Sequence, residues 1–240
     1  MNLIILYPTD YIAEDRVLLN DYRHKHVVAV LKAKVGEQVR VGDLNGCMGL
    51  GSILVLTDDT LEMSVVCDVD PPHAAPLILL LALPRPKVFK RILITATTLG
   101  IKRICLINSW RVDKSYWGSP SLAPDEINSQ LVTGLEQARD TVLPVVTLHS
   151  RFKPFVEDEL QNISGGGPCF VAHPHNAQPC PQFPLCSEDQ MVTVAVGPEG
   201  GFIEYEVDKL IESNFTAIEI GARILRVETA ITKLASLLIE

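Results

Sequence analysis

Two segments near the C-terminal end of the sequence share one layout: a short apolar run, a glycine-containing turn and then helical spacing. The first run, 191–196, leads into Gly197-Pro198-Glu199-Gly200-Gly201-Phe202, and the second, 217–220, leads into Gly221-Ala222-Arg223-Ile224-Leu225-Arg226. Strand, turn and helix in this order build a parallel sheet. We therefore expect the two strand ends to lie side by side. Ligands of such sheets bind outside the carboxyl ends of the strands, which predicts a small-molecule pocket there.

The same alternation extends back to about residue 77. Helices between strand-like runs predict a mainly parallel α/β sheet. The expected buried strands are Leu77–Leu83, Ile104–Asn108, Val145–Leu148, Cys169–Ala172, Val192–Val196 and Ala217–Ile220. The expected helices are Val88–Leu99, Glu126–Arg139, Pro154–Ile163, Ile203–Asn214 and Arg226–Ile239.

Residues 1 to about 70 have a different pattern, typical of a small β-rich module. Gln38–Val41 alternates polar and apolar residues, Asn45-Gly46 is a strong hairpin signal, and Tyr22–Lys32 has helical spacing. The segment Asp70–Pro76 contains too much proline for a helix or a central strand, so it reads as a linker. We expect two domains, 1–72 and 73–240.

Composition limits the class of protein. The chain has 240 residues and is 47% hydrophobic, which excludes a disordered chain. It contains no apolar run near the roughly 20 residues that a membrane span needs. The start, Met1-Asn2-Leu3-Ile4, has neither a basic region nor a cleavage site, so we expect no signal peptide and a cytoplasmic enzyme.

The charge is unevenly distributed. The net charge is −8, which argues against a broad nucleic-acid surface, yet one segment, 85–114, carries eight basic residues and one acidic residue. This segment predicts a local anion-binding face, and solvated helix surface is an equally good reading of charge alone. Its basic residues are Arg85, Lys87, Lys90, Arg91, Lys102, Arg103, Arg111 and Lys114.

The six cysteines form no CxxC pair. Cys180 and Cys186 follow His173 and His175, which would suit a metal, but their spacing is irregular and the segment is rich in proline. An ordinary loop is the favoured reading, and we expect no metal.

The two C-terminal motifs also carry a resemblance. Val196–Phe202 together with Ile218–Ala230 resembles the RsmE family, SPOUT-class enzymes that methylate N3 of a uridine in 16S rRNA with S-adenosylmethionine. Looser similarity includes Glu136-Gln137-Ala138-Arg139. The resemblance implies a PUA-like β-barrel that binds RNA, followed by a SPOUT α/β domain with a trefoil knot, and a homodimer with active sites near the subunit interface. The chain departs from the usual pattern at Val227, Thr98 and Lys32, where the family usually has Thr, Glu and Arg.

On this reading the substrate is 16S rRNA in the small ribosomal subunit, and the cofactor S-adenosylmethionine lies against the strand ends and glycine loops. The expected cofactor-binding residues are Ala82, Leu83, His173, Gly197, Pro198, Glu199, Gly200, Gly201, Ile220, Gly221, Arg223, Ile224, Leu225 and Arg226. The expected RNA-binding residues are Arg85, Lys87, Lys90, Arg91, Arg111 and Lys114.

Arg226 and Glu199 are the candidate catalytic residues. A uracil that loses its N3 proton passes negative charge to its carbonyl oxygens, and a preorganised guanidinium stabilises such charge. Glu199 either accepts the proton or orients a loop. Structural roles are the alternatives: Glu199 would cap the helix that follows it, and Arg226 and Glu228 would pair with other helices.

Two further alternatives stay open. The final helix carries Ile231, Leu234, Ala235 and Leu238 on one face, which suits internal packing as well as a dimer contact. For function, a methyltransferase of another RNA and an RNA-binding protein without catalysis remain. A nucleotide-dependent oxidoreductase is disfavoured, because Leu83-Pro84-Arg85-Pro86 stands where G-x-G-x-x-G belongs.

Overall fold

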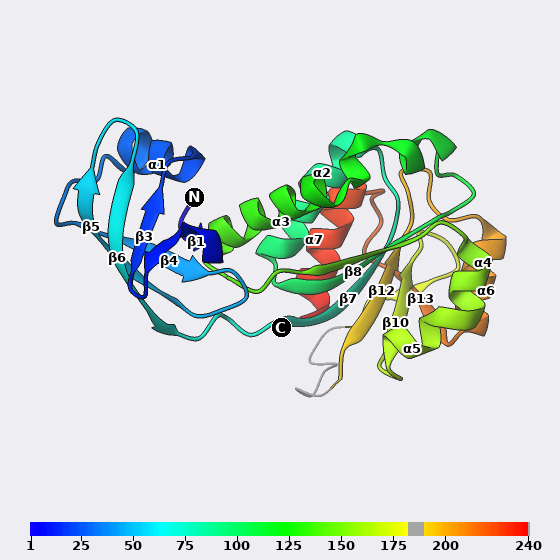
Figure 1. Ribbon diagram of the computed structural model, residues 1–240. Coiled ribbons are helices and arrows are strands. Elements are labelled where there is room, and N and C mark those ends of the chain that lie inside the picture. The colour runs from blue at the N-terminus through cyan, green and yellow to red at the C-terminus, as the bar shows by residue number, and fades with distance from the viewer. Residues whose placement is uncertain (182–189, 240) are drawn as a thin grey trace. The chain divides into compact units, whose positions relative to one another are not determined.

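The computed structural model describes residues 1–181 and 190–239 (Figure 1). The chain forms two compact units. The first comprises Met1–His73 together with Val132–Leu143, and the second contains the rest of the described chain.

The first unit is built on a curled mixed sheet with strand order β1-β4-β5-β6-β3-β2. Only β1 and β4 pair in parallel; the other neighbours are antiparallel. The predicted alternation is confirmed in β4, where Val39 and Val41 are buried and Gln38 and Arg40 are exposed. The strands are β1 (Ile4–Leu6), β2 (Tyr11–Ala13), β3 (Arg16–Leu19), β4 (Gln38–Asp43), β5 (Met48–Leu56) and β6 (Leu61–Val69).

The predicted helical stretch of this unit is also present. It consists of α1 (Tyr22–His26) and a π-helical turn, η2 (Val27–Leu31). The Asp21 side chain caps α1 by accepting a hydrogen bond from the Arg23 N–H, and the helix ends at Lys32, which adopts a left-handed φ of 52°. A short 3₁₀ turn, η1 (Pro8–Asp10), precedes β2.

An ionic cluster around the buried Arg23 and Asp10 links α1 to η1 and β1. The Arg23 guanidinium donates to both carboxylate oxygens of Asp10, at 2.6 and 2.8 Å, and to the Ile5 carbonyl at 2.7 Å. It also pairs with Asp21 at 2.7 Å. Burial alone would raise the pKa of Asp21, but the hydrogen bonds from Arg23 outweigh it and hold that pKa below its usual range.

Residues 132–143 complete the first unit from a distant part of the sequence. Val132 and Leu135 pack against Leu3 and Ile5 in one buried cluster. The N–H groups of Asn2 and Leu3 donate to the Glu136 carbonyl, and the Tyr22 hydroxyl donates to Glu136 Oε1 at 2.9 Å. The motif at 136–139 therefore anchors the start of the chain.

The described residues of the second unit form a seven-stranded sheet with order β11-β13-β10-β12-β7-β8-β9, and every neighbouring pair is parallel. This confirms the predicted parallel sheet. Its strands are β7 (Ala75–Ala82), β8 (Ile101–Ile107), β9 (Val145–His149), β10 (Cys169–Ala172), β11 (Gln178–Pro179), β12 (Val192–Val196) and β13 (Phe215–Glu219).

One expectation about this sheet is wrong: the strands that precede the two glycine turns are not neighbours. β10 lies between β12 and β13 and pairs with both. A helix with its side chains is about 10 Å wide, and neighbouring strands are about 4.8 Å apart. A helical crossover from β12 to β13 therefore spans two strand spacings comfortably.

The linker also ends earlier than expected. β7 begins at Ala75 and includes Pro76, although the proline content of the segment argued against a central strand. The register between β7 and β8 shifts between Ala75 and Ile78, so Pro76 lies in an irregular stretch. Proline is tolerated at such a position near the start of a strand.

The helices of the second unit follow the predicted pattern, with ends displaced by a few residues. α7 packs against α2 and β12, and Figure 1 shows α2 and α7 next to each other. The apolar face of α7 is buried inside the chain, which settles the alternative in favour of internal packing. The helices are α2 (Pro86–Thr98), η3 (Lys114–Gly118), η4 (Pro120–Leu122), α3 (Pro124–Ala138), α4 (Phe152–Pro154), η5 (Phe155–Glu159), α5 (Leu160–Ser164), α6 (Glu204–Glu212) and α7 (Val227–Leu238); from Val132 onward, α3 belongs to the first unit. None of the helices in the described ranges has the length and hydropathy to cross a membrane.

Candidate functional site

The carboxyl ends of four neighbouring strands form a continuous row at one edge of the parallel sheet. Ala172 of β10 lies opposite Val196 of β12 on one side and Ile218 of β13 on the other, and Val196 lies opposite Leu81 of β7. His173 therefore emerges between the two glycine loops. This row is the place where ligands of open α/β sheets bind.

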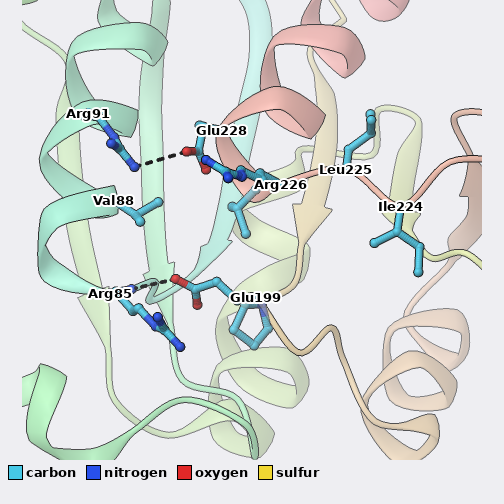
Figure 2. Close-up of a pocket in the computed structure, with 10 residues that line it drawn as sticks. Arg85, Val88, Arg91, Glu199, Ile224, Leu225, Arg226 and Glu228 are labelled. Carbon is cyan, nitrogen blue, oxygen red and sulfur yellow. Dashed lines mark hydrogen bonds and ion pairs between the residues drawn. The ribbon is translucent and has the colours of Figure 1, made fainter.

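A hollow of about 410 Å³ opens where the glycine loops meet α2 (Figure 2). It joins residues predicted for the cofactor, Pro198, Glu199, Ile224, Leu225 and Arg226, with Arg85 and Arg91, which were predicted for RNA. Val88, Val227 and Glu228 complete the wall. Nine predicted cofactor residues do not line it: Ala82, Leu83, His173, Gly197, Gly200, Gly201, Ile220, Gly221 and Arg223.

Glu199 lies at the start of α2. Its Oε1 accepts a hydrogen bond from the Arg85 N–H at 3.1 Å, as the dashed line in Figure 2 marks, and Arg85 is the residue that precedes α2. The positive end of the helix dipole stabilises a carboxylate there. The alternative in which Glu199 caps the following helix is wrong, because Glu206 caps α6 by accepting from the Ile203 N–H at 3.0 Å.

Glu228 and Arg226 differ in their ion pairing. Glu228 Oε1 pairs with Arg91 Nη2 of α2 at 3.1 Å, which confirms the alternative that Glu228 pairs with another helix. Arg226 precedes the first residue of α7 and is exposed. Within the described ranges, 1–181 and 190–239, Arg226 forms no ion pair, so its guanidinium is available to a ligand.

The charges around the hollow favour an anion. Its wall has three guanidinium groups and two carboxylates. Glu228 already pairs with Arg91, and Glu199 binds a backbone N–H. The remaining cations suit phosphate or a developing oxyanion, the groups to which guanidinium binds most strongly.

The basic segment at 85–114 does not form one free cationic surface. Lys90 Nζ pairs with Glu126 at 2.7 Å, and Lys102 is buried. The Arg111 side chain donates to the Gly200 carbonyl of the first glycine loop. Lys87 and Lys114 are exposed. Local sequence could not reveal these contacts, because Glu126 and Gly200 are distant in the chain.

The glycines serve both the turns and the close packing of the loops. Gly201 and Gly221 have φ values of 73° and 113°, a region that favours glycine. A Cβ on Gly197 would stand 2.9 Å from the Phe202 nitrogen, and one on Gly200 would stand 3.0 Å from Arg111 Cδ. Side chains are thus excluded from the edge on which a cofactor would rest, and Ile224 and Leu225 supply apolar surface. The residues present fit a cofactor with both polar and apolar parts.

Sequence reasoning missed Glu206, Ser109 and Trp110. Glu206 is almost fully buried, and it accepts from the Ser109 hydroxyl at 3.0 Å and from the Trp110 N–H at 2.7 Å. The only signal in the sequence was that Glu206 is an acidic residue in the first turn of a predicted helix. Such a residue usually caps its own helix, so nothing indicated a contact with Ser109 or Trp110.

The histidines after β10 face each other. The rings of His173 and His175 are 5.9 Å apart in an edge-on arrangement. Burial, followed by the nearby His175, lowers the pKa of His173. Across the described ranges, no group of three or more histidine, cysteine or acidic side chains could hold a metal. Cys186, which was considered for a metal site, lies outside the described residues.

Comparison with known proteins gives consistent matches. The sequence is 27% identical over 233 residues to ribosomal RNA small subunit methyltransferase E of Treponema pallidum, covering 96% of this chain and 87% of the relative. It is 26% identical over 236 residues to ribosomal RNA small subunit methyltransferase E 1 of Borreliella burgdorferi, covering 96% and 94% of the two chains.

A solved structure has the same fold. Ribosomal RNA small subunit methyltransferase E of Neisseria gonorrhoeae, bound to S-adenosyl methionine, superimposes with a TM-score of 0.75 at 20% identity, covering 99% of this chain and 95% of that one. The model of the RNA methyltransferase domain family matches residues 71–239. Because this match spans well over half of the sequence, the chain belongs to the RNA methyltransferase domain family, and the resemblance to the RsmE family is confirmed.

Proposed function

We propose that the protein methylates N3 of one specific uridine in 16S rRNA of the small ribosomal subunit, with S-adenosylmethionine as the methyl donor. The observation that carries the proposal is the hollow that combines Arg226 and Glu199 of the two family motifs with Arg85 and Arg91 of α2. The two relatives that match 96% of the chain, ribosomal RNA small subunit methyltransferases E and E 1, support the same substrate.

The cofactor would rest on the ends of β7, β10, β12 and β13 and on the loops 197–201 and 220–226. When bound, S-adenosylmethionine supplies a methyl group already activated on a sulfonium. The protein's part is to exclude water and to align the uracil with that methyl carbon, which can lower a barrier by several kcal/mol. Ile224 and Leu225 would cover the apolar parts, and the glycines would admit close backbone contact.

The uracil nitrogen must lose its proton before or as it forms the N–CH₃ bond. The products are N3-methyluridine, S-adenosylhomocysteine and a proton. We assign Arg226 to donate hydrogen bonds to the uracil oxygen on which negative charge develops. Glu199 uses Oε1 to bind the Arg85 N–H, which leaves Oε2 to accept the proton or to fix the loop.

RNA would reach the hollow along the start of α2. Arg85, Lys87, Lys90 and Arg91 lie there, and Arg111 and Lys114 follow β8. A base that is to be modified must leave its stack, so phosphate contacts on either side of it would hold the strand in place. We propose that residues 1–72 form a PUA-like domain, which would add further contacts to a folded RNA.

The remaining parts of the proposal are architectural. Residues 73–240 would form a SPOUT domain with a trefoil knot, and the active protein would be a cytoplasmic homodimer. The apolar face of α7 is occupied inside the chain, so the dimer contact must use other surfaces. Light scattering at micromolar concentration should give twice the single-chain mass of 26.4 kDa.

One assay tests the proposal as a whole. Small ribosomal subunits that lack the modification are incubated with the protein and methyl-labelled S-adenosylmethionine, and the 16S rRNA is then digested to nucleosides. Label in N3-methyluridine is the expected result. Label in ribose, at carbon 5 or only in transfer RNA would refute the substrate while leaving the cofactor assignment intact. An Arg226→Ala variant is the control for contaminating activity.

A further inference from the structure

An exposed tryptophan lies beside the candidate site. Trp110 is 81% exposed and follows β8 at the same edge of the sheet as the glycine loops. A large aromatic side chain left in water is informative, because tryptophan is usually well buried and contributes strongly to binding where it is not.

The backbone on both sides of Trp110 is anchored. The Ser109 side chain is buried and donates to Glu206 Oε2, and the Trp110 N–H donates to Glu206 Oε1 at 2.7 Å. Val112, two residues on, is buried as well. The indole extends into solvent from a backbone that is already fixed, so a ligand that contacts it need not order the backbone as well.

The same anchors tie Trp110 to the first glycine motif, whose residues Pro198 and Glu199 line the hollow described above. Glu206 also accepts from the Ile203 N–H, at the end of the first glycine motif. Arg111 donates to the Gly200 carbonyl inside that motif. Trp110 is thus held by the segment 200–206 that borders Glu199, and its neighbours Arg111 and Lys114 are cationic and exposed.

We propose that Trp110 is a stacking surface for an unpaired nucleobase next to the target nucleotide. This inference rests on the proposed function, since it takes RNA to be the substrate. Every base has an aromatic face, and exposed aromatic residues beside cations are the usual stacking surfaces for single-stranded nucleic acid. The indole, carried on an anchored backbone, would stack on a flanking base while the cations bind phosphates.

Fluorescence tests the contact directly, because Trp110 and Trp117 are the two tryptophans of the chain. In a Trp117→Phe variant, Trp110 is the only indole emitter. Titration with deproteinised 16S rRNA, excited at the red edge of the tryptophan band, should quench its emission as binding saturates. The matched Trp110→Phe variant, which keeps Trp117, should show little quenching. Unchanged Trp110 emission at saturating RNA would overturn the proposal.

Affinity gives the second test. Trp110→Ala should weaken binding of the small ribosomal subunit about tenfold, within the range of one lost base stack, and Trp110→Phe should restore most of it. Affinity for S-adenosylmethionine and the mass by light scattering should not change. A change of mass would show that Trp110 contacts another protein chain and would overturn the proposal.

The two levels of proposal can be told apart. If the wild type methylates the small ribosomal subunit and Trp110→Ala binds it with unchanged affinity, only the stacking surface is refuted. If the wild type neither binds nor methylates any RNA, the proposed function fails and the stacking surface fails with it. Circular dichroism of each variant confirms that the fold is intact.

Discussion

At the level of single residues, Glu136 shows how burial and charge combine in the first unit. Its carboxylate is buried, and it accepts a hydrogen bond from the Tyr22 hydroxyl. Burial raises the pKa of Glu136, and the Tyr22 hydrogen bond opposes that change without cancelling it. The unfolded chain has its ordinary value near 4.5. A raised folded pKa means that the folded state holds the proton more tightly than the unfolded state.

We therefore expect Glu136→Gln to remove a pH-dependent loss of stability. The contribution of Glu136 is complete below about pH 4.5 and decreases as the pH rises through the folded pKa. The difference in free energy of unfolding, variant minus wild type, should therefore rise as the pH increases from about 4.5 to above the folded pKa of Glu136. Urea unfolding at several pH values measures it. Glu14→Gln, at an exposed carboxylate, is the control, and equal pH profiles for both variants would contradict the assignment.

Arg226 should act on turnover more than on binding. Loss of one preorganised donor typically lowers kcat by about 10²-fold or more, so Arg226→Ala should lower single-turnover methylation by about that factor. Affinity for the small ribosomal subunit should change by less than about threefold, since one exposed contact is lost. Arg151→Ala is the matched control, because Arg151 is exposed, does not line the hollow and lies outside both glycine loops. Equal losses in the two variants would exclude a special role for Arg226.

At the level of elements, the first glycine loop should be sensitive to a bulky side chain at position 200. A Cβ there would stand 3.0 Å from Arg111 Cδ, so the branched side chain of Gly200→Val would push Arg111 away from its hydrogen bond to the Gly200 carbonyl and occupy the face of the loop. Calorimetry should show affinity for S-adenosylmethionine reduced about tenfold or more. Gly118→Val is the control, since a Cβ on Gly118 meets no atom within 4 Å. Unchanged affinity in a folded Gly200→Val variant would place the cofactor elsewhere.

The start of α2 should account for much of the salt dependence of RNA binding. Replacing Arg85, Lys90 and Arg91 by alanine removes three charges, so the slope of log affinity against log salt should flatten by up to about 2. Cofactor affinity should persist. The control removes three basic side chains elsewhere in the same unit: Arg151, Lys153 and Lys209. If both triple variants flatten the slope equally, the basic residues at the start of α2 are not a preferred RNA-binding site.

The sequence predicted each element better than it predicted the neighbours of that element. Hydrophobic periodicity is local, so it identified β12 and β13 with nearly correct ends. It carries no information on where a crossover helix returns the chain, so it predicted the strand β10 correctly but not the position of β10 between the other two. The same limit applies to the site: the motif residue Glu199 was recognised, but its contact with Arg85 joins residues that are 114 positions apart.

At the level of the whole molecule, the chain enters the first unit twice, at 1–73 and again at 132–143. A fragment that begins at Ala74 would retain Val132 and Leu135 without Leu3 and Ile5, which cover them in the first unit. We expect this fragment to aggregate, because buried apolar side chains would face water. Expression of residues 74–240 and size-exclusion chromatography measure this.

A variant of the fragment provides the control. Val132→Gln with Leu135→Gln should return the fragment to a single monodisperse species, since the cause of aggregation is then removed. A monodisperse fragment without these changes would show that the segment 132–143 folds independently of residues 1–73.

Because the first unit is built from two separate segments of the chain, recombination between genes of related proteins is restricted. An exchange of the first 73 codons between two relatives would combine Leu3, Ile5 and Tyr22 of one parent with Leu135 and Glu136 of the other. The side chains from the two parents must then pack and hydrogen-bond with each other, although their codons are far apart in the gene. Changes at these positions are expected to be inherited together, so the N-terminal module and the segment 132–143 should share one evolutionary history.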